Sequence, residues 1–172
     1  AMGGAQYLHS FDKLLFMPSD LTAGLEYNRD RLKDNMWGYD RHTDQTVNIY
    51  SAFLQNEWKN KHWGILIGGR LDKHNMVDDI IFSPRANLRF NPTYYINLRL
   101  SYSSGFRAPQ AFDEDMHIEN VGGTVAMIER AKDLKEEKSQ SFSMSADMYH
   151  RFGAFQTNLL VEGFYTRLTD VF

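Results

Sequence analysis

The sequence predicts an all-β fold, an antiparallel meander of about eight strands. Three observations support this fold class. Apolar and polar residues alternate in segment after segment, which is the side-chain period of a strand with two different faces. Short and long connections alternate between these segments, as in a series of hairpins. Finally, no apolar run approaches the ~20 residues of a transmembrane helix, and the mean hydropathy is -0.50.

Four strands are predicted in the first half of the chain. A weak alternation covers 6–12, and a clear one covers 21–27, where Leu, Ala, Leu and Tyr alternate with Thr, Gly and Glu. The segment 50–58 alternates in the same way, although Asn56 interrupts its apolar face. The segment 63–71 places Trp, two Ile and Leu on one face. All four have the length of an ordinary strand.

Four more strands follow in the second half. The segment 86–90 alternates Ala, Leu and Phe with Asn and Arg, and 96–102 alternates Ile, Leu, Leu and Tyr with Asn, Arg and Ser. The strand that begins at 96 must end before Pro109, which has no N–H to give to a ladder. The segments 142–148 and 155–165 complete the meander with the same period of two.

The lengths of the connections predict that one end of the sheet carries short turns and the other end long loops. Short turns are expected at 17–20, 60–62, 91–93 and 152–154, and long loops at 31–43, 73–81 and 110–137. All short turns then lie at one end, which is the asymmetry of outer-membrane barrels. Seven aromatic residues ring the short-turn end, as in a membrane–water interface. They are Phe16, Trp58, Trp63, Phe90, Tyr94, Tyr95 and Phe155.

Alternation alone does not reveal whether the apolar face points into a core or out into lipid. The loop asymmetry and the aromatic ring favour a segment of a transmembrane β-barrel. The alternative is a soluble β-barrel that binds a ligand in an apolar interior. Eight strands can close as a small barrel, or they can form an open curved sheet whose two edges pair with another copy of the chain.

Composition excludes several classes of function. A formal net charge of -3 and a pI of about 6.1 argue against a nucleic-acid partner. The chain has no Cys, so disulfides and thiolate metal sites are excluded. No nucleophile elbow, zinc-binding His-Glu-x-x-His or phosphate-binding Gly loop is present, so we expect no enzyme, no metal site and no cofactor.

Several segments resemble a known family. Residues 98–112, with Ser-Tyr-Ser-Ser-Gly-Phe-Arg-Ala-Pro, resemble the signature barrel strand of TonB-dependent outer-membrane receptors, which climbs into a large extracellular loop. Weaker resemblances to the family's strand motifs lie at 53–58, 69–72, 83–90, 134–139 and 163–170. Glu136 stands where the family usually has Pro. The sequence of residues 106–118 is most similar to that of receptors of the Bacteroidetes type.

The resemblance implies a role in nutrient import. The chain would supply wall and extracellular loops of a bacterial outer-membrane receptor for a scarce solute such as a siderophore, haem or cobalamin. Its partners would be membrane lipid, a small-molecule or metal-chelate ligand and, in the full receptor, a plug domain and TonB. Such barrels have roughly 22 strands, and neither a plug domain nor a secretory signal is recognisable here. We therefore expect an engineered piece of a longer protein, with a cloning remnant at 1–5 and barrel at 6–172.

The resemblance also implies roles for individual residues. We expect a ligand-binding loop that contains Arg107, Gln110, Asp113, Glu114, Asp115, His117 and Glu119. The lumen-facing side chains are expected to be Arg70, Arg85, Arg89, Asn97 and Arg99. The lipid-facing side chains are expected to be Ile65, Ile67, Leu88, Leu98, Leu100 and Tyr102.

Overall fold

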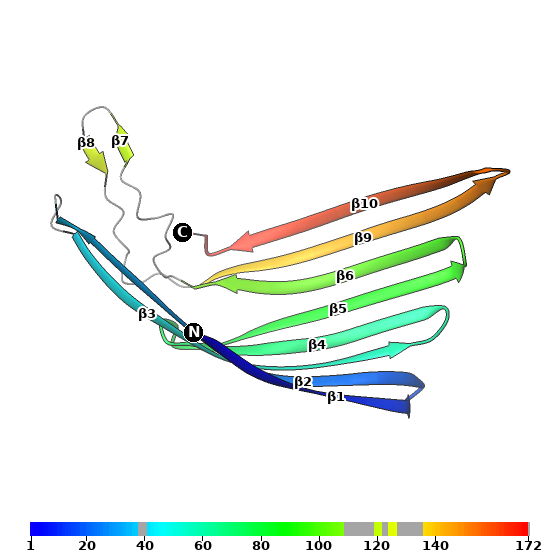
Figure 1. Cartoon of the computed structure of the whole chain (residues 1–172), viewed down its shortest axis with the longest axis horizontal. Helices are drawn as coiled ribbons and strands as arrows, with labels where there is room; N and C mark the ends of the chain where they lie inside the picture. Colours follow the sequence, from blue (N-terminus) through cyan, green and yellow to red (C-terminus); the bar gives the residue numbers. More distant parts are fainter. Residues whose placement is uncertain (38–40, 109–118, 122–123, 127–135, 172) are drawn as a thin grey trace.

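The computed structural model of the chain describes residues 1–37, 41–108, 119–121, 124–126 and 136–171. Its main feature is one antiparallel sheet of eight strands (Figure 1). In sheet order these strands are β1 (Met2–Leu14), β2 (Met17–Met36), β3 (Arg41–Lys59), β4 (Trp63–His74), β5 (Ile80–Thr93), β6 (Ile96–Arg107), β9 (Glu137–Phe152) and β10 (Phe155–Thr169). The predicted meander of eight strands is confirmed.

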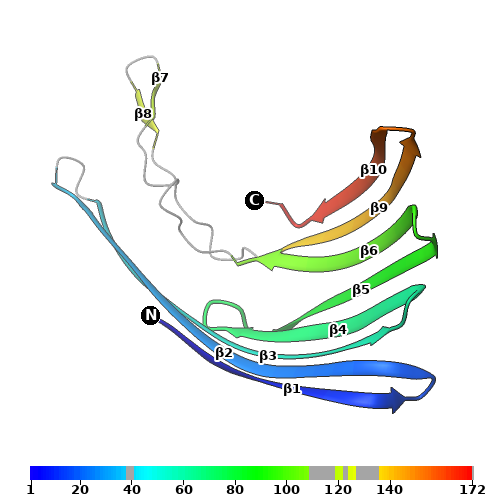
Figure 2. The same cartoon turned by 45° about the vertical axis from the view of Figure 1, so that its right-hand side comes forward.

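The sheet is open rather than closed. Figures 1 and 2 show it bent into a trough, with β1 along one edge and β10 along the other. In the sheet order, β1 and β10 each have a single neighbour. Of the two forms that the sequence allows, the structure therefore shows the open curved sheet. Within the described residues, no helix is long and apolar enough to cross a membrane.

Two of the predicted long loops are wrong in extent. The expected loop at 31–43 is largely paired strand, because the ladder between β2 and β3 runs without a break from Ser19 opposite Trp58 to Met36 opposite Arg41. Polar residues occupy both faces of this extension, so its strands carry no apolar period. The expected loop at 73–81 shrinks to residues 75–79, between β4 and β5.

The third predicted loop, 110–137, contains two short strands that the alternation does not reveal. They are β7 (Glu119–Val121) and β8 (Thr124–Ala126), which pair with each other and not with the main sheet. Three-residue strands are too short to show a period. The rest of 109–135 lies outside the described residues.

The short turns lie at one end of the sheet, as predicted, although two of them are displaced. The β1–β2 turn is at 15–16 instead of 17–20, and the β5–β6 turn is at 94–95 instead of 91–93. Leu15 adopts a φ of 65° in the first of these turns, a backbone that the turn forces on a non-glycine residue. In the β9–β10 turn, Gly153 adopts a φ of 58° without that cost.

The N-terminal residues belong to the sheet. Residues 2–5 lie in β1 and face 25–28 of β2. The first strand therefore begins before the predicted position 6. That residues 1–5 derive from cloning stays a prediction.

The two faces of the sheet differ in burial. On β4, Asp72 and His74 point to one face and are buried. Ile67 and Leu71 point to the opposite face and are about half exposed, at 56% and 49%. Side chains converge on the inner side of a curved sheet and spread apart on the outer side. The polar face is therefore concave and the apolar face convex.

Candidate functional site

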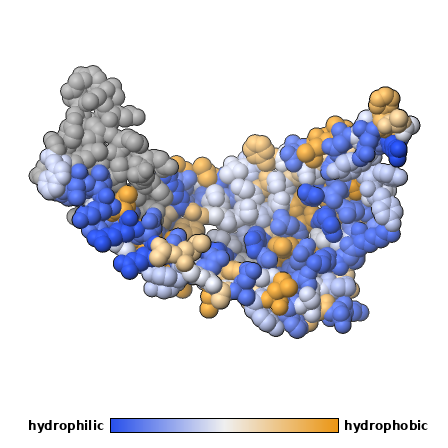
Figure 3. All heavy atoms as spheres, in the orientation of Figure 1, coloured by the Kyte–Doolittle hydropathy of each residue, from blue (hydrophilic) through white to orange (hydrophobic). Residues whose placement is uncertain are grey.

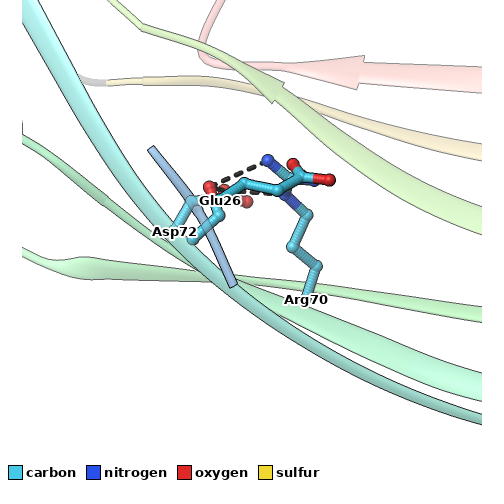
Figure 4. A network of polar contacts seen from close by, with 4 residues as sticks. Glu26, Arg70 and Asp72 are labelled. Carbon is cyan, nitrogen blue, oxygen red and sulfur yellow. Dashed lines mark hydrogen bonds and ion pairs between the residues drawn. The ribbon is translucent and has the colours of Figure 1, made fainter. Parts of the chain in front are cut away.

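A network of four side chains crosses three strands on the polar face. Arg70 donates from Nη1 to Glu26 Oε2 at 2.6 Å, from Nε to Asp72 Oδ1 at 2.8 Å and from Nη2 to Ser51 Oγ at 2.8 Å. The Ser51 hydroxyl donates to Asp72 Oδ1 at 2.5 Å. Figure 4 shows Glu26, Arg70 and Asp72 together on the side toward which the sheet curves.

The strand register explains why these residues meet. Glu26 of β2 faces Ser51 of β3, and Ser51 faces Asp72 of β4, so the three lie in one row across the sheet. Arg70 is two residues from Asp72 and points to the same face. The Asp72 side chain is only 3% exposed, whereas Arg70 and Glu26 are 40% and 43% exposed. The network thus joins a buried carboxylate, that of Asp72, to partly exposed charged groups that face the inside of the trough.

The other predicted lumen residues lie on the same polar face. Arg85 is opposite Gly68, and Arg89 is opposite Arg99, which follows Asn97 by two positions. Arg85 donates to Gln55, and Arg99 Nε donates to Asn97 Oδ1 at 2.9 Å. Arg85 and Arg99 are thus each paired with an amide side chain of the same face. These groups can bind a polar surface or ligand, but none of them is an activated nucleophile.

The predicted lipid-facing residues all lie on the convex apolar face. Register pairs Ile65 with Leu88 and Leu88 with Leu100 in one row. Leu98 follows on the same face, and the next row holds Ile67, Ala86, Tyr102 and Phe142. The Tyr102 and Phe142 rings lie 4.8 Å apart. Many large apolar side chains of this face are exposed, which marks it as a surface that another apolar phase can cover.

Aromatic side chains gather at the short-turn end, as the sequence predicts. Phe16 stacks on Trp58 with ring centroids 5.6 Å apart, and Trp63 stacks on Phe90 at 4.2 Å. Trp58 Nε1 also donates to the Leu14 carbonyl at 3.0 Å. Rings that pack on one side and donate a hydrogen bond on the other suit a membrane–water boundary.

The predicted ligand-binding loop is described only at its ends. Arg107 is the last residue of β6, opposite Glu137 of β9, and Glu119 begins β7. Gln110, Asp113, Glu114, Asp115 and His117 lie outside the described residues. Elsewhere in the described chain, no group of three His, Asp or Glu side chains could hold a metal ion.

An ion pair fixes the far end of the β2–β3 hairpin. Arg31 donates from Nε and Nη2 to the two carboxylate oxygens of Asp44, at 3.0 and 2.6 Å. Both side chains are about half exposed. These hydrogen bonds from Arg31 lower the pKa of Asp44 below its ordinary value. Figure 3 shows hydrophilic side chains along this part of the hairpin, which extends well beyond the rest of the sheet.

The sequence places Arg70 on the polar face but does not predict its network with Glu26, Ser51 and Asp72. The available signal was the Arg70–Asp72 spacing of two, which puts both charges on the same side of one strand. The partners on β2 and β3 depend on register, which the sequence does not show. His74, whose Nδ1 accepts from the Met76 N–H at 3.0 Å and whose side chain is fully buried, was also missed.

Comparison with known proteins identifies the family. The family model "TonB dependent receptor-like, beta-barrel" matches residues 3–172. The chain belongs to this family. Members of the TonB-dependent receptor family lie in the bacterial outer membrane, and this chain belongs there too. The matched proteins are transport receptors, not enzymes.

Individual proteins also resemble the chain over most of its length. The "Probable hemoglobin and hemoglobin-haptoglobin-binding protein 3" of Haemophilus influenzae is 25% identical over 146 residues, which are 84% of this chain and 12% of that protein. The siderophore receptor PirA of Pseudomonas aeruginosa superposes with a TM-score of 0.67 at 16% identity, over 92% of this chain and 29% of the receptor. The ferric enterobactin receptor PfeA of the same species gives 0.68 at 19% identity, over 97% and 26%.

The chain therefore spans about an eighth of the matched haemoglobin-binding protein and about a quarter to a third of the matched receptor structures. At these identities the solved structures show the shared fold.

Proposed function

We propose that the chain forms wall and extracellular loops of an outer-membrane TonB-dependent receptor that imports a scarce solute. One observation carries the proposal: the sheet is polar on its concave face and apolar on its convex face. A barrel wall in lipid needs this arrangement, with apolar residues outward and polar residues toward the lumen. In this role, Arg70, Arg85, Arg89, Asn97 and Arg99 line the lumen. The apolar side chains of the convex face contact lipid: Ile65, Ile67, Leu88, Leu98, Leu100 and Tyr102.

The relatives support the class of solute. One is described as a haemoglobin-binding protein, and others as siderophore or ferric enterobactin receptors. One PfeA structure holds enterobactin. We therefore propose an iron-bearing or similarly scarce solute, such as a siderophore, haem or cobalamin. The full receptor would also contain a plug domain and take energy from TonB. The similarity of residues 106–118 to Bacteroidetes sequences supports a receptor of that type. In this proposal the chain has no enzymatic role.

Spin labels test the orientation of the two faces. With the full chain in lipid bilayers, labels at Leu98 and Leu100 should be relaxed by oxygen, which dissolves in lipid. Labels at Asn97 and Arg99 should be relaxed by a water-soluble nickel complex. The soluble-barrel alternative predicts the reverse pattern, because its apolar face would be sealed inside. The reverse result, or equal access at all four sites, would overturn the proposal.

We also propose that the segment between β6 and β9 helps to capture the ligand. Function concentrates on loops held by a rigid scaffold, and this segment carries most of the predicted ligand-binding residues. Deleting 115–132 should leave the receptor in the outer membrane, since loop length changes closure entropy slowly, but ligand binding to whole cells should fall. Unchanged binding would remove the segment from the ligand site.

A further inference from the structure

The apolar face has a hollow near the end of the sheet that carries the long connections. It has a volume of about 520 Å³ and is lined by residues of β1 to β5, with Gly3, Ala5 and Ala52 at its floor. Leu25, Leu71 and Ile80 stand around these small residues. The hollow arises because one row across four strands alternates small and large side chains: Ala5, Leu25, Ala52 and Leu71 face one another in register.

The next row toward the long connections is amphipathic. It contains Gly3, Tyr27, Tyr50, Lys73 and Ile80, again in register. The two tyrosine rings lie 4.9 Å apart, and the Tyr27 hydroxyl donates to Asn48 Oδ1 at 2.9 Å. Such rings, apolar at the body and hydrogen-bonded at the tip, are typical of the boundary between hydrocarbon and headgroups.

Two basic residues, Arg29 and Arg31, lie next to the tyrosine row, on its side toward the long connections. Arg29 and Arg31 continue the same face of β2, at about 7 Å per pair of residues. Arg31 is neutralised by Asp44. Among the described residues, no carboxylate forms an ion pair with Arg29 or Lys73. Lys73 Nζ is held instead by the carbonyls of Val77 at 3.0 Å and Asp78 at 2.5 Å, which fixes the ammonium beside the hollow and leaves one N–H to donate.

Toward the long connections, the apolar row is thus followed by the tyrosine row and then by basic residues. We propose that the hollow, Tyr27, Tyr50, Arg29 and Lys73 bind one phosphorylated lipid of the surrounding leaflet. An acyl chain lies in the hollow, and the phosphate lies between the Arg29 guanidinium and the Lys73 ammonium. A free anion would use the two cations alone and would leave the apolar hollow without a role, so the occupant is a lipid. This inference rests on the proposed placement of the apolar face in the membrane.

The test uses the full chain in neutral detergent and titrates fluorescent phosphatidic acid, with fluorescent phosphatidylcholine as the headgroup control. We expect tighter binding of phosphatidic acid. Arg29→Gln should weaken it roughly fivefold, the effect of one basic side chain at an anionic surface. Arg167→Gln is the matched control, because Arg167 is exposed on the same face at the opposite edge of the sheet; it should leave binding unchanged.

A second variant tests the hollow without changing charge. Ala52→Phe fills the floor and should weaken phosphatidic acid binding while Arg29 and Lys73 remain. Equal effects of Arg29→Gln and Arg167→Gln, no effect of Ala52→Phe, or displacement of the lipid by millimolar inorganic phosphate would each overturn the site. Spin labels at Leu98 and Leu100 in the same samples separate the two proposals. Detergent contact there without selective lipid binding refutes the lipid site alone, whereas no contact refutes the membrane placement.

Discussion

Arg70 joins three strands because a single guanidinium has enough donors to reach Glu26, Ser51 and Asp72 at once. The buried carboxylate of Asp72 depends on this contact. Without Arg70 it would keep the Ser51 hydroxyl but lose its counter-ion. A buried charge that loses its partner is costly, so this network is the point of the polar face where one substitution matters most.

We therefore predict that Arg70→Gln destabilises the sheet. Removing one partner of a fully buried pair costs about 3–5 kcal/mol. Because the Arg70 side chain is 40% exposed, we expect about 1–3 kcal/mol. Urea unfolding in bilayers measures the change. Arg99→Gln is the control, since the one hydrogen bond described for Arg99 goes to the neutral Asn97 side chain. Equal losses in both variants would show that the network adds nothing specific.

In contrast to Arg70, Asn56 is a buried polar residue whose unpaired amide lowers the stability of the fold. It lies on the apolar face, is 8% exposed, and neither its side-chain oxygen nor its nitrogen has a hydrogen-bond partner in the described chain. Asn56→Leu should raise the free energy of unfolding by about 1–2 kcal/mol. Asn87→Leu, on the exposed polar face, should not. A loss of stability in Asn56→Leu would mean that the amide has a partner in the membrane.

The sequence predicts the side of the sheet on which a residue lies far better than it predicts contacts. A period of two assigns every residue of a strand to a face, and for this reason Arg85 and Leu100 are placed correctly. The contact from Arg70 to Glu26 spans 44 positions. It depends on the registers of β2 with β3 and of β3 with β4. The β3–β4 turn lies where the sequence predicts it, but the β2–β3 connection is expected as a long loop and is mostly paired strand, so the sequence does not show this register.

At the scale of elements, the β2–β3 hairpin stands out by its length. Its strands have 20 and 19 residues, whereas a tilted strand needs about 9–11 to cross the hydrocarbon. The excess projects beyond the membrane, where water covers both sides. Nothing there selects apolar residues for one face, so the period of two disappears and the sequence resembles a loop.

The Arg31–Asp44 pair predicts how this projecting part responds to acid. The pKa of Asp44 is lower in the folded hairpin than in the unfolded chain. Its stabilising effect is therefore complete above the ordinary Asp pKa of about 4 and is lost as the pH falls through the lower, folded value. Amide exchange, corrected for intrinsic rates, should lose protection at 31–36 and 41–46 below about pH 4. Asp44→Asn should show that reduced protection already at neutral pH.

The membrane-spanning part of the same hairpin provides the control. Amides around Thr22 and Gln55, which are paired in the ladder at a distance from both Asp44 and the Arg70 network, should keep their protection in acid. Parallel loss of protection along the entire hairpin would show that acid unfolds the sheet as a whole.

For the whole molecule, the open edges are the main consequence of the fold. In the described sheet, β1 and β10 each expose one row of backbone N–H and C=O groups. An even number of antiparallel strands leaves β10 antiparallel to the β1 of a neighbouring copy, so the meander can continue from chain to chain. We predict edge-to-edge self-association in detergent.

Cysteine cross-linking measures this association, because the chain has no Cys of its own. A mixture of chains with Ala5→Cys and Val161→Cys, both on edge strands, should form disulfide-linked dimers that increase with protein concentration. A mixture with Ile67→Cys and Leu100→Cys, both on central strands, should not. Similar dimer yields in the two mixtures, or monomers throughout, would contradict pairing through the edges.

Strand count and order could be predicted from alternation, but closure could not. Whether a sheet closes depends on strand number, stagger and tilt together. These are properties of the whole ladder, and no segment of the sequence reports them. The same limit applies to the sites: the assignment of residues to the two faces follows from single strands, whereas the Arg70 network and the hollow of the apolar face depend on the register of several strands.

Each strand of the main sheet pairs only with its neighbours along the chain, two for the inner strands and one each for β1 and β10. A gene that gains or loses two adjacent strands leaves the pairing of the remaining strands intact, apart from one new junction. The wall can therefore change circumference over evolutionary time in steps of one hairpin, and its outer loops can be exchanged between relatives without redesign of their neighbours.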